Sequence, residues 1–127
     1  ERKAGRWRRI VEEAARQCGR PTVPRVSPPE PFAQVMALAR QAEGAGNDLV
    51  LLPTLAVPAI PLRDALKEHR SGSVMAVIGP EGDFTVEEVA LARRRGAIPV
   101  SLGRLTLRSE TAAIATLAVM QHLVGAL

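Results

Sequence analysis

The sequence predicts an α/β fold in which a parallel β-sheet is flanked by helices. Three short apolar runs, at residues 48–52, 74–78 and 98–102, have the length and composition of buried strands. Segments with helical periodicity, several of them followed by glycine, precede and separate these runs. Because strands and helices alternate at the spacing of βα units, we expect a parallel sheet that helices cover on both faces.

Two helices are expected before the first strand. Apolar residues recur at helical spacing over residues 6–18, and Gly19 is suited to the left-handed conformation in which many helices end. The proline-rich residues 22–30 predict an extended connector. Pro31 is well placed as the first residue of a second helix, and the glycines within residues 44–47 are expected to end it.

One helix is expected between each pair of successive strands. A proline-spaced loop after the first strand leads to a short helix near residues 62–69. Thr85 and Glu88 have the spacing of a capping box, so a helix is predicted over residues 86–95, with Gly96 after its end.

The last helix is apolar nearly all round. It is predicted to start at Ser109 or Glu110 and to run almost to the C-terminus, with few polar residues after its first turn. A helix of this composition is buried on more than one side. Since a small domain covers one side, we expect another subunit to cover the second and predict a homodimer through this helix.

The composition sets limits on function. The 127 residues are 46% hydrophobic, which is enough for one domain with a buried core. Lys and Arg number 17 against 13 Asp and Glu, and the net charge of +4 is compatible with a nucleic-acid partner without establishing one. A single cysteine excludes an internal disulfide framework, and no metal site is expected. With no signal peptide and no membrane-spanning run, we expect a cytoplasmic protein. The chain starts without Met inside a helical pattern, so we also expect it to be part of a longer protein.

A glycine-containing loop follows the second predicted strand. Parallel α/β sheets bind ligands at the carboxyl ends of their strands, and residues 79–84, Gly-Pro-Glu-Gly-Asp-Phe, occupy such a position. The glycines allow the main chain to approach a ligand closely. The loop lacks the Gly-Lys-Ser/Thr ending of a phosphate-binding loop and the glycine spacing of a dinucleotide-binding one. A purely structural Gly-Pro turn is the alternative.

A second loop, residues 101–111, follows the third predicted strand and leads into the last helix. Arg108 and Glu110 flank the start of that helix. They are candidates for chemistry, because they lie next to a strand's carboxyl end. Alternatively, Glu110 stabilises the helix N-terminus electrostatically and Arg108 is its solvated partner.

Several short segments form a series over nearly the whole chain. They read EAARQCGR at residues 13–20, VP at 23–24, VIGPEG at 77–82, EEV at 87–89, VSLG at 100–103 and LRSETA at 107–112. In this order and spacing, the segments resemble the motifs of RsmE-type ribosomal RNA small-subunit uridine N3-methyltransferases of the SPOUT, or α/β-knot, superfamily.

The resemblance implies a fold and a cofactor. Residues 1–127 would be the knotted methyltransferase domain, with a deep C-terminal trefoil knot and without the family's N-terminal β-barrel RNA-binding domain and first βα segment. S-adenosyl-L-methionine would lie in the knot, held largely by backbone groups. The residues implied in cofactor binding are Leu52, Pro53, Ile78, Gly79, Pro80, Gly82, Leu102, Gly103, Arg104, Leu105, Thr106 and Leu107.

The activity implied is methylation of N3 of a uridine in small-subunit (16S) ribosomal RNA. Because N3 must lose its proton, we expect Arg108 to stabilise the uracil anion. Glu81 and Glu110 are candidate bases or substrate-orienting groups, and the sequence does not decide between them. An Arg-Arg-Arg cluster at residues 93–95 is one candidate for contacts with RNA phosphates, with a solvated helix face as the alternative. Basic residues of the N-terminal region are also expected to contact RNA phosphates. These residues are Arg6, Arg9 and Arg20.

The chain departs from the family pattern at several positions. Asp83 stands where the family usually has Gly, Ser109 replaces a usual Thr, and Leu105 and Thr106 also differ. A carboxylate at residue 83 could disfavour RNA phosphate nearby. Together with the expected absence of the β-barrel domain, this leaves one alternative function, a non-catalytic knotted RNA-binding or ribosome-assembly module.

Overall fold

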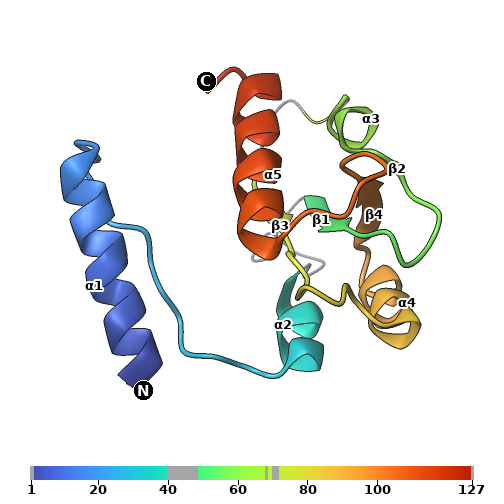
Figure 1. Cartoon of the computed structure of the whole chain (residues 1–127), viewed down its shortest axis with the longest axis horizontal. Helices are drawn as coiled ribbons and strands as arrows, with labels where there is room; N and C mark the ends of the chain where they lie inside the picture. The colour runs from blue at the N-terminus through green and yellow to red at the C-terminus, as the bar shows by residue number, and fades with distance from the viewer. Residues whose placement is uncertain (1, 40–48, 68, 70–71, 127) are drawn as a thin grey trace. The chain divides into compact units, whose positions relative to one another are not determined.

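The computed structural model describes residues 2–39, 49–67, 69 and 72–126 (Figure 1). The chain forms two compact units, Glu1–Phe32 and Ala33–Leu127. The glycines predicted to end the second helix, and the first residue of the first predicted strand, lie outside the described residues. Within the described residues, no helix has both the length and the apolar character needed to cross a membrane.

The N-terminal unit consists of helix α1, Arg2–Gln17, and the extended connector after it. Gly19 adopts φ 73°, and the Arg20 amide donates to the Ala15 carbonyl at 2.9 Å. This left-handed ending is the one predicted for Gly19. The Arg8 Nε group donates to the Val26 carbonyl at 3.4 Å, so the connector turns back along α1.

A four-stranded sheet organises the second unit, and it is parallel as predicted. Its strands are β1 (Leu49–Pro53), β2 (Ile60–Pro61), β3 (Val74–Ala76) and β4 (Ile98–Ser101), in the order β2-β4-β1-β3. All three pairings are parallel, with Leu51 opposite Ala76 on one side and Ile98 on the other. The sequence predicted β1, β3 and β4 but not the two-residue edge strand β2.

Helices lie on both sides of this sheet (Figure 1). Helices α3 (Leu62–Leu66) and α5 (Ser109–Leu123) pack on one side, where Leu51, Val100 and Met120 belong to one cluster of buried apolar residues. Figure 1 shows α2 (Phe32–Ala39) and α4 (Val86–Arg94) on the opposite side. The predicted helix near residues 62–69 is shorter than expected, since it ends at Leu66.

The predicted capping box starts α4. The Glu88 amide donates to the Thr85 hydroxyl at 3.1 Å, and the Thr85 amide donates to the Glu88 carboxylate at 3.2 Å. Gly96 follows the helix with φ 91°. Both ends of α4 are therefore specified by local sequence.

Helix α5 begins at Ser109, one of the two predicted starting residues, and Arg108 is its N-cap without a side-chain capping bond. Thr116 and Met120 face the interior and are buried. On the outer surface, Ile114 is 70% exposed and Leu117 54% exposed. The helix thus buries one apolar face and leaves a second one uncovered within this unit.

Candidate functional site

A pocket lies where the loops after β1, β3 and β4 meet the first turn of α5. These are the carboxyl ends of neighbouring parallel strands, the usual ligand position in such sheets. The pocket contains about 530 Å³ of empty space, including its open mouth. It is lined by Pro53, Thr54, Leu55, Ile78, Gly79, Pro80, Glu81, Asp83, Leu102, Gly103, Leu105, Thr106, Leu107, Ser109 and Ala112.

The loop after β1 forms the first wall. The Thr54 amide donates to the Val100 carbonyl at 3.1 Å, which continues the pairing of β1 with β4. The Thr54 side chain is buried, and its hydroxyl oxygen accepts a hydrogen bond from the Ala56 amide at 3.0 Å. Local hydrogen bonds therefore fold this loop tightly at the end of its strand.

The loop after β3, residues 77–84, forms the second wall. The Asp83 amide donates to the Pro80 carbonyl at 2.9 Å and closes a turn. A Cβ atom at Gly79 would lie 3.0 Å from the ring of the buried Phe84, so a side chain at residue 79 would force the ring to move. Glycine therefore suits this position, because it leaves the Phe84 ring in its place.

Asp83 joins the first two walls. Its carboxylate accepts hydrogen bonds from the Thr54 hydroxyl at 2.8 Å, the Leu55 amide at 2.7 Å and the Phe84 amide at 2.7 Å. Partial burial raises the pKa of Asp83. The hydrogen bonds from Leu55, Phe84, Thr54 and Ala56 outweigh burial, so the pKa is lowered overall.

The loop after β4 forms the third wall. The Gly103 amide donates to the Ser101 hydroxyl oxygen at 3.1 Å, and that hydroxyl lies 3.2 Å from the Gly103 carbonyl, to which it donates. Gly103 adopts φ 119°, a conformation that side-chain-bearing residues rarely take. Leu105 is 82% exposed, an unusual position for a large apolar side chain next to a pocket. The wall therefore offers main chain and apolar surface to a ligand.

Helix α5 closes the pocket at its first turn. The Ser109 hydroxyl donates to the Gly79 carbonyl at 2.8 Å, thirty positions away along the chain. This bond fixes the start of α5 against the second wall. The replacement of a usual Thr by Ser at this position keeps the hydroxyl that makes the bond.

The charged residues that line the pocket are acidic. Of the described residues that line it, Glu81 and Asp83 carry charge, and both are carboxylates. No Lys or Arg belongs to this described lining. Such a pocket favours a ligand with positive charge over a phosphate group.

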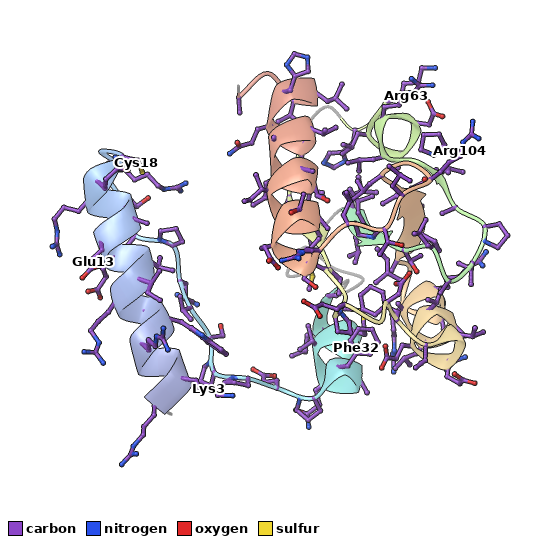
Figure 2. The ribbon with its side chains drawn as sticks, in the orientation of Figure 1. Lys3, Glu13, Cys18, Phe32, Arg63 and Arg104 are labelled. Carbon is purple, nitrogen blue, oxygen red and sulfur yellow. The ribbon has the colours of Figure 1, made fainter. Side chains whose placement is uncertain are left out.

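Most of the residues predicted to bind the cofactor are brought together here. Those in the lining are Pro53, Ile78, Gly79, Pro80, Leu102, Gly103, Leu105, Thr106 and Leu107. Three lie outside the lining for different reasons. The Leu52 side chain is fully buried in the core, Gly82 is an exposed turn residue, and Figure 2 shows the Arg104 side chain at the outer edge of this unit.

The candidate catalytic residues are placed differently from one another. Glu81 lines the pocket, whereas Arg108 and Glu110 are exposed residues at the start of α5, next to lining residues. Arg108 and Glu110 form no ion pair with each other, although both lie in the described part of the chain. The electrostatic pairing considered from the sequence is therefore absent.

The basic residues predicted to contact RNA belong to the N-terminal unit. Arg6 and Arg9 are exposed on α1, and Arg20 lies just after it, where its Nε group donates to the Thr22 carbonyl at 3.5 Å. No group of three or more metal-ligating side chains occurs within the residues that the structure describes.

Some lining residues were not predicted as site residues. Thr54 and Leu55 follow the predicted strand end directly, so position alone could have suggested them. Asp83 and Ser109 were noted as departures from a family pattern, but their long-range hydrogen bonds have no local signal. Ala112 also lines the pocket, one turn into α5.

The chain is similar to known RNA methyltransferases. The profile of the RNA methyltransferase domain matches residues 1–121. Ribosomal RNA small subunit methyltransferase E of Synechocystis is 36% identical over 93% of this chain and 38% of its own length. The protein of the same name from Mycobacterium tuberculosis is 34% identical over 88% of this chain and 42% of its own length.

The chain is also similar to solved structures of methyltransferases. Ribosomal RNA small subunit methyltransferase E from Neisseria gonorrhoeae, bound to S-adenosyl methionine, superposes with a TM-score of 0.78 and 32% identity over 96% of this chain and 48% of that one. A Legionella pneumophila protein in complex with the same cofactor gives a TM-score of 0.81 and 36% identity, over 95% of this chain and 46% of that one. The chain spans less than half the length of these relatives. The chain therefore belongs to the RNA methyltransferase domain family, in the group of the ribosomal RNA small subunit methyltransferases E.

Proposed function

We propose that the pocket binds S-adenosyl-L-methionine and that the protein methylates N3 of a uridine in small-subunit ribosomal RNA. The observation that carries this proposal is the pocket itself, built from three strand-end loops in a fold shared with cofactor-bound relatives. The bound cofactor supplies an electrophilic methyl group. The role of the protein is to bind and orient the cofactor and the uridine and to stabilise the charge that develops during the reaction.

The chemistry of the pocket lining supports this cofactor. S-adenosyl-L-methionine carries a sulfonium and an ammonium group, and the charged lining residues are the carboxylates of Glu81 and Asp83. Apolar walls at Leu102, Leu105 and Leu107 suit an adenine ring. The open surroundings of Gly103 leave its main chain accessible.

Glu81 and Arg108 are proposed to act on the uracil. N3 of uracil carries a proton and lies on the pairing edge, so the base must be unpaired or extruded before reaction. Arg108, exposed at the start of α5, would stabilise the anion that forms as the proton leaves. Of the two candidate bases, Glu81 lines the pocket and Glu110 does not, which favours Glu81.

The RNA and a second subunit are proposed to bind outside the pocket. Arg6, Arg9 and Arg20 supply positive charge for phosphate contacts. The uncovered apolar face of α5, with Ile114 and Leu117, is proposed as a homodimer interface. We further propose that the C-terminal segment forms a trefoil knot, on the basis of the family. A ribosomal RNA substrate would place the reaction in the cytoplasm.

Titration calorimetry with S-adenosyl-L-methionine, followed by methylation of 16S ribosomal RNA, tests the function. We expect saturable cofactor binding and a methyl group mapped to N3 of one uridine. Methylation at another atom would contradict the proposed position. RNA binding without any cofactor heat would favour the alternative, a non-catalytic RNA-binding or assembly module.

Light scattering tests the proposed dimer. We expect a homodimer whose dissociation is promoted by Leu117→Glu, because a buried unpaired carboxylate is costly at an apolar interface. A folded monomer at micromolar concentration would contradict the interface.

A further inference from the structure

Asp83 combines an unfavourable backbone conformation with a set of long-range contacts. Its φ is 63°, and among the described residues other than glycine it is the one with a left-handed backbone. L-residues other than Asn and Asp rarely adopt this region, because Cβ approaches the following carbonyl oxygen. A residue held in such a conformation needs compensating interactions.

The compensating interactions reach far along the chain. The Asp83 Oδ1 atom accepts from the Thr54 hydroxyl at 2.8 Å, and Oδ2 accepts from the Leu55 amide at 2.7 Å. The Thr54 oxygen in turn accepts from the Ala56 amide at 3.0 Å. One carboxylate therefore holds the backbone of the loop after β1 and the hydroxyl that organises that loop.

Both segments that Asp83 joins are walls of the pocket. Thr54 and Leu55 line one side, and Gly79, Pro80 and Glu81 line the other. The third hydrogen bond, from the Phe84 amide at 2.7 Å, leaves the carboxylate occupied by protein donors. Asp83 is thus placed to act on a ligand through the two loops rather than by direct contact.

We propose that Asp83 is a positioning residue whose carboxylate holds the Thr54–Leu55 wall and the Gly79–Glu81 wall at the separation that the cofactor requires. The role rests on the proposed function, since it assumes that the pocket binds S-adenosyl-L-methionine. Asp tolerates the left-handed backbone, and its side chain connects two loops that glycine would leave unconnected.

The test uses variants that separate the bridge from the backbone conformation, all in the intact protein. Asp83→Gly keeps the left-handed φ without strain and removes the carboxylate. Asp83→Asn keeps the side-chain shape but replaces one of the two accepting carboxylate oxygens with an NH₂ group, which cannot accept a hydrogen bond. Thr54→Val removes the bridging hydroxyl with little change in shape. Asp64→Asn, which alters an exposed carboxylate 3.8 Å from Arg63 and outside the pocket lining, is the matched control.

Two measurements are made on each variant. Hydrogen exchange without ligand reports whether the Leu55 and Phe84 amides are protected, and calorimetry reports the Kd of S-adenosyl-L-methionine. We expect both amides to exchange faster in Asp83→Gly and its Kd to rise about tenfold, the effect of losing charge-assisted hydrogen bonds. Thr54→Val should weaken cofactor binding less than Asp83→Gly does. The double variant with both substitutions should bind the cofactor like Asp83→Gly, because the Asp83 carboxylate and the Thr54 hydroxyl act as one unit. Asp64→Asn should bind like wild type.

Three other outcomes overturn the proposal in distinguishable ways. Unchanged exchange in Asp83→Gly would show that the bridge does not order the loop. Faster exchange with an unchanged Kd would show that the bridge stabilises the loop without positioning the cofactor. No cofactor heat in wild type would overturn the proposed function, and the exchange data would then show whether the bridge itself exists. If Asp83→Gly fails to fold, Asp83→Asn and Thr54→Val give the same comparison.

Discussion

The Ser109 hydroxyl lies 2.8 Å from the Gly79 carbonyl oxygen and donates a hydrogen bond to it. This bond joins the first turn of α5 to the loop after β3, and both residues line the pocket. Arg108, the proposed catalytic arginine, is the neighbouring residue and the N-cap of the same helix. The bond therefore couples the proposed cofactor site to the proposed catalytic side chain.

Ser109→Ala should destabilise the protein and weaken cofactor binding. A neutral hydrogen bond of this kind contributes about 1 kcal/mol, and its loss leaves a partly buried carbonyl without its partner. Thermal unfolding and calorimetry with S-adenosyl-L-methionine measure the two effects. Ser109→Thr is the control, because it retains the hydroxyl. If Ser109→Ala binds cofactor as tightly as wild type, the bond does not shape the pocket.

Gly103→Val should abolish cofactor binding. A Cβ atom at residue 103 would meet none of the described atoms within 4 Å. Because Gly103 lines the pocket, the valine side chain would occupy ligand space. The substitution should also cost stability, on the order of 1–3 kcal/mol for a side chain held in a sparsely populated backbone region, because φ is 119°.

Gly125→Ala is the matched control for that strain. Gly125 also has a positive φ, 79°, and a Cβ atom at this position would meet no other atom within 4 Å. It lies after α5 and outside the pocket lining. The substitution should lower the melting temperature without changing the Kd. Normal cofactor affinity in Gly103→Val would show that the third wall does not contact the ligand.

Much of the fold could be predicted from local sequence, and the interior of the site could not. The capping box of Thr85 and Glu88 and the left-handed Gly19 are encoded within a few residues. The strand β2 has two residues, one of them Pro61, so it carries no periodic signal. Its existence depends on pairing with β4, which sequence proximity does not indicate.

The same distinction holds for the candidate site. Loops after strands could be identified by position, and Gly79 and Gly103, which lie in such loops, both line the pocket. Position could not show that Arg104 points outward, because successive residues of one loop can face opposite ways. The bond between Asp83 and Thr54 spans 29 positions and forms only once the strands pair.

The carboxylate of Asp83 should make stability depend on acid pH. Its pKa is lowered in the folded protein, so its contribution is present above the unfolded pKa and is lost as the pH falls through the folded value. We expect the stability difference between wild type and Asp83→Asn to be constant above about pH 5 and to shrink below about pH 4. Urea unfolding across this range measures it. A difference that grows on acidification would contradict the assignment.

Arg108→Ala should reduce methyl transfer far more than cofactor affinity. An arginine that faces uracil meets little charge in the ground state and a developing anion in the transition state. Loss of one such donor typically costs about 10²–10³ in rate. Arg108→Lys should recover part of the rate, because an ammonium group keeps the charge but loses the planar set of donors.

The structural alternative for Arg108 makes a different prediction. If the side chain served mainly to stabilise the start of α5, its removal would lower the melting temperature and leave the rate nearly normal. The structure argues against this, since Arg108 makes no side-chain capping bond and no ion pair with Glu110, both being described residues. Three measurements on intact Arg108→Ala, with Arg63→Ala as the control variant, decide between the catalytic and the structural role. They are the melting temperature, the S-adenosyl-L-methionine affinity and the single-turnover rate. Arg63 is the suitable control, because its side chain is 78% exposed on α3 and outside the pocket lining. A selective loss of rate in Arg108→Ala alone supports catalysis, whereas a loss of stability with near-normal turnover removes Arg108 from the mechanism.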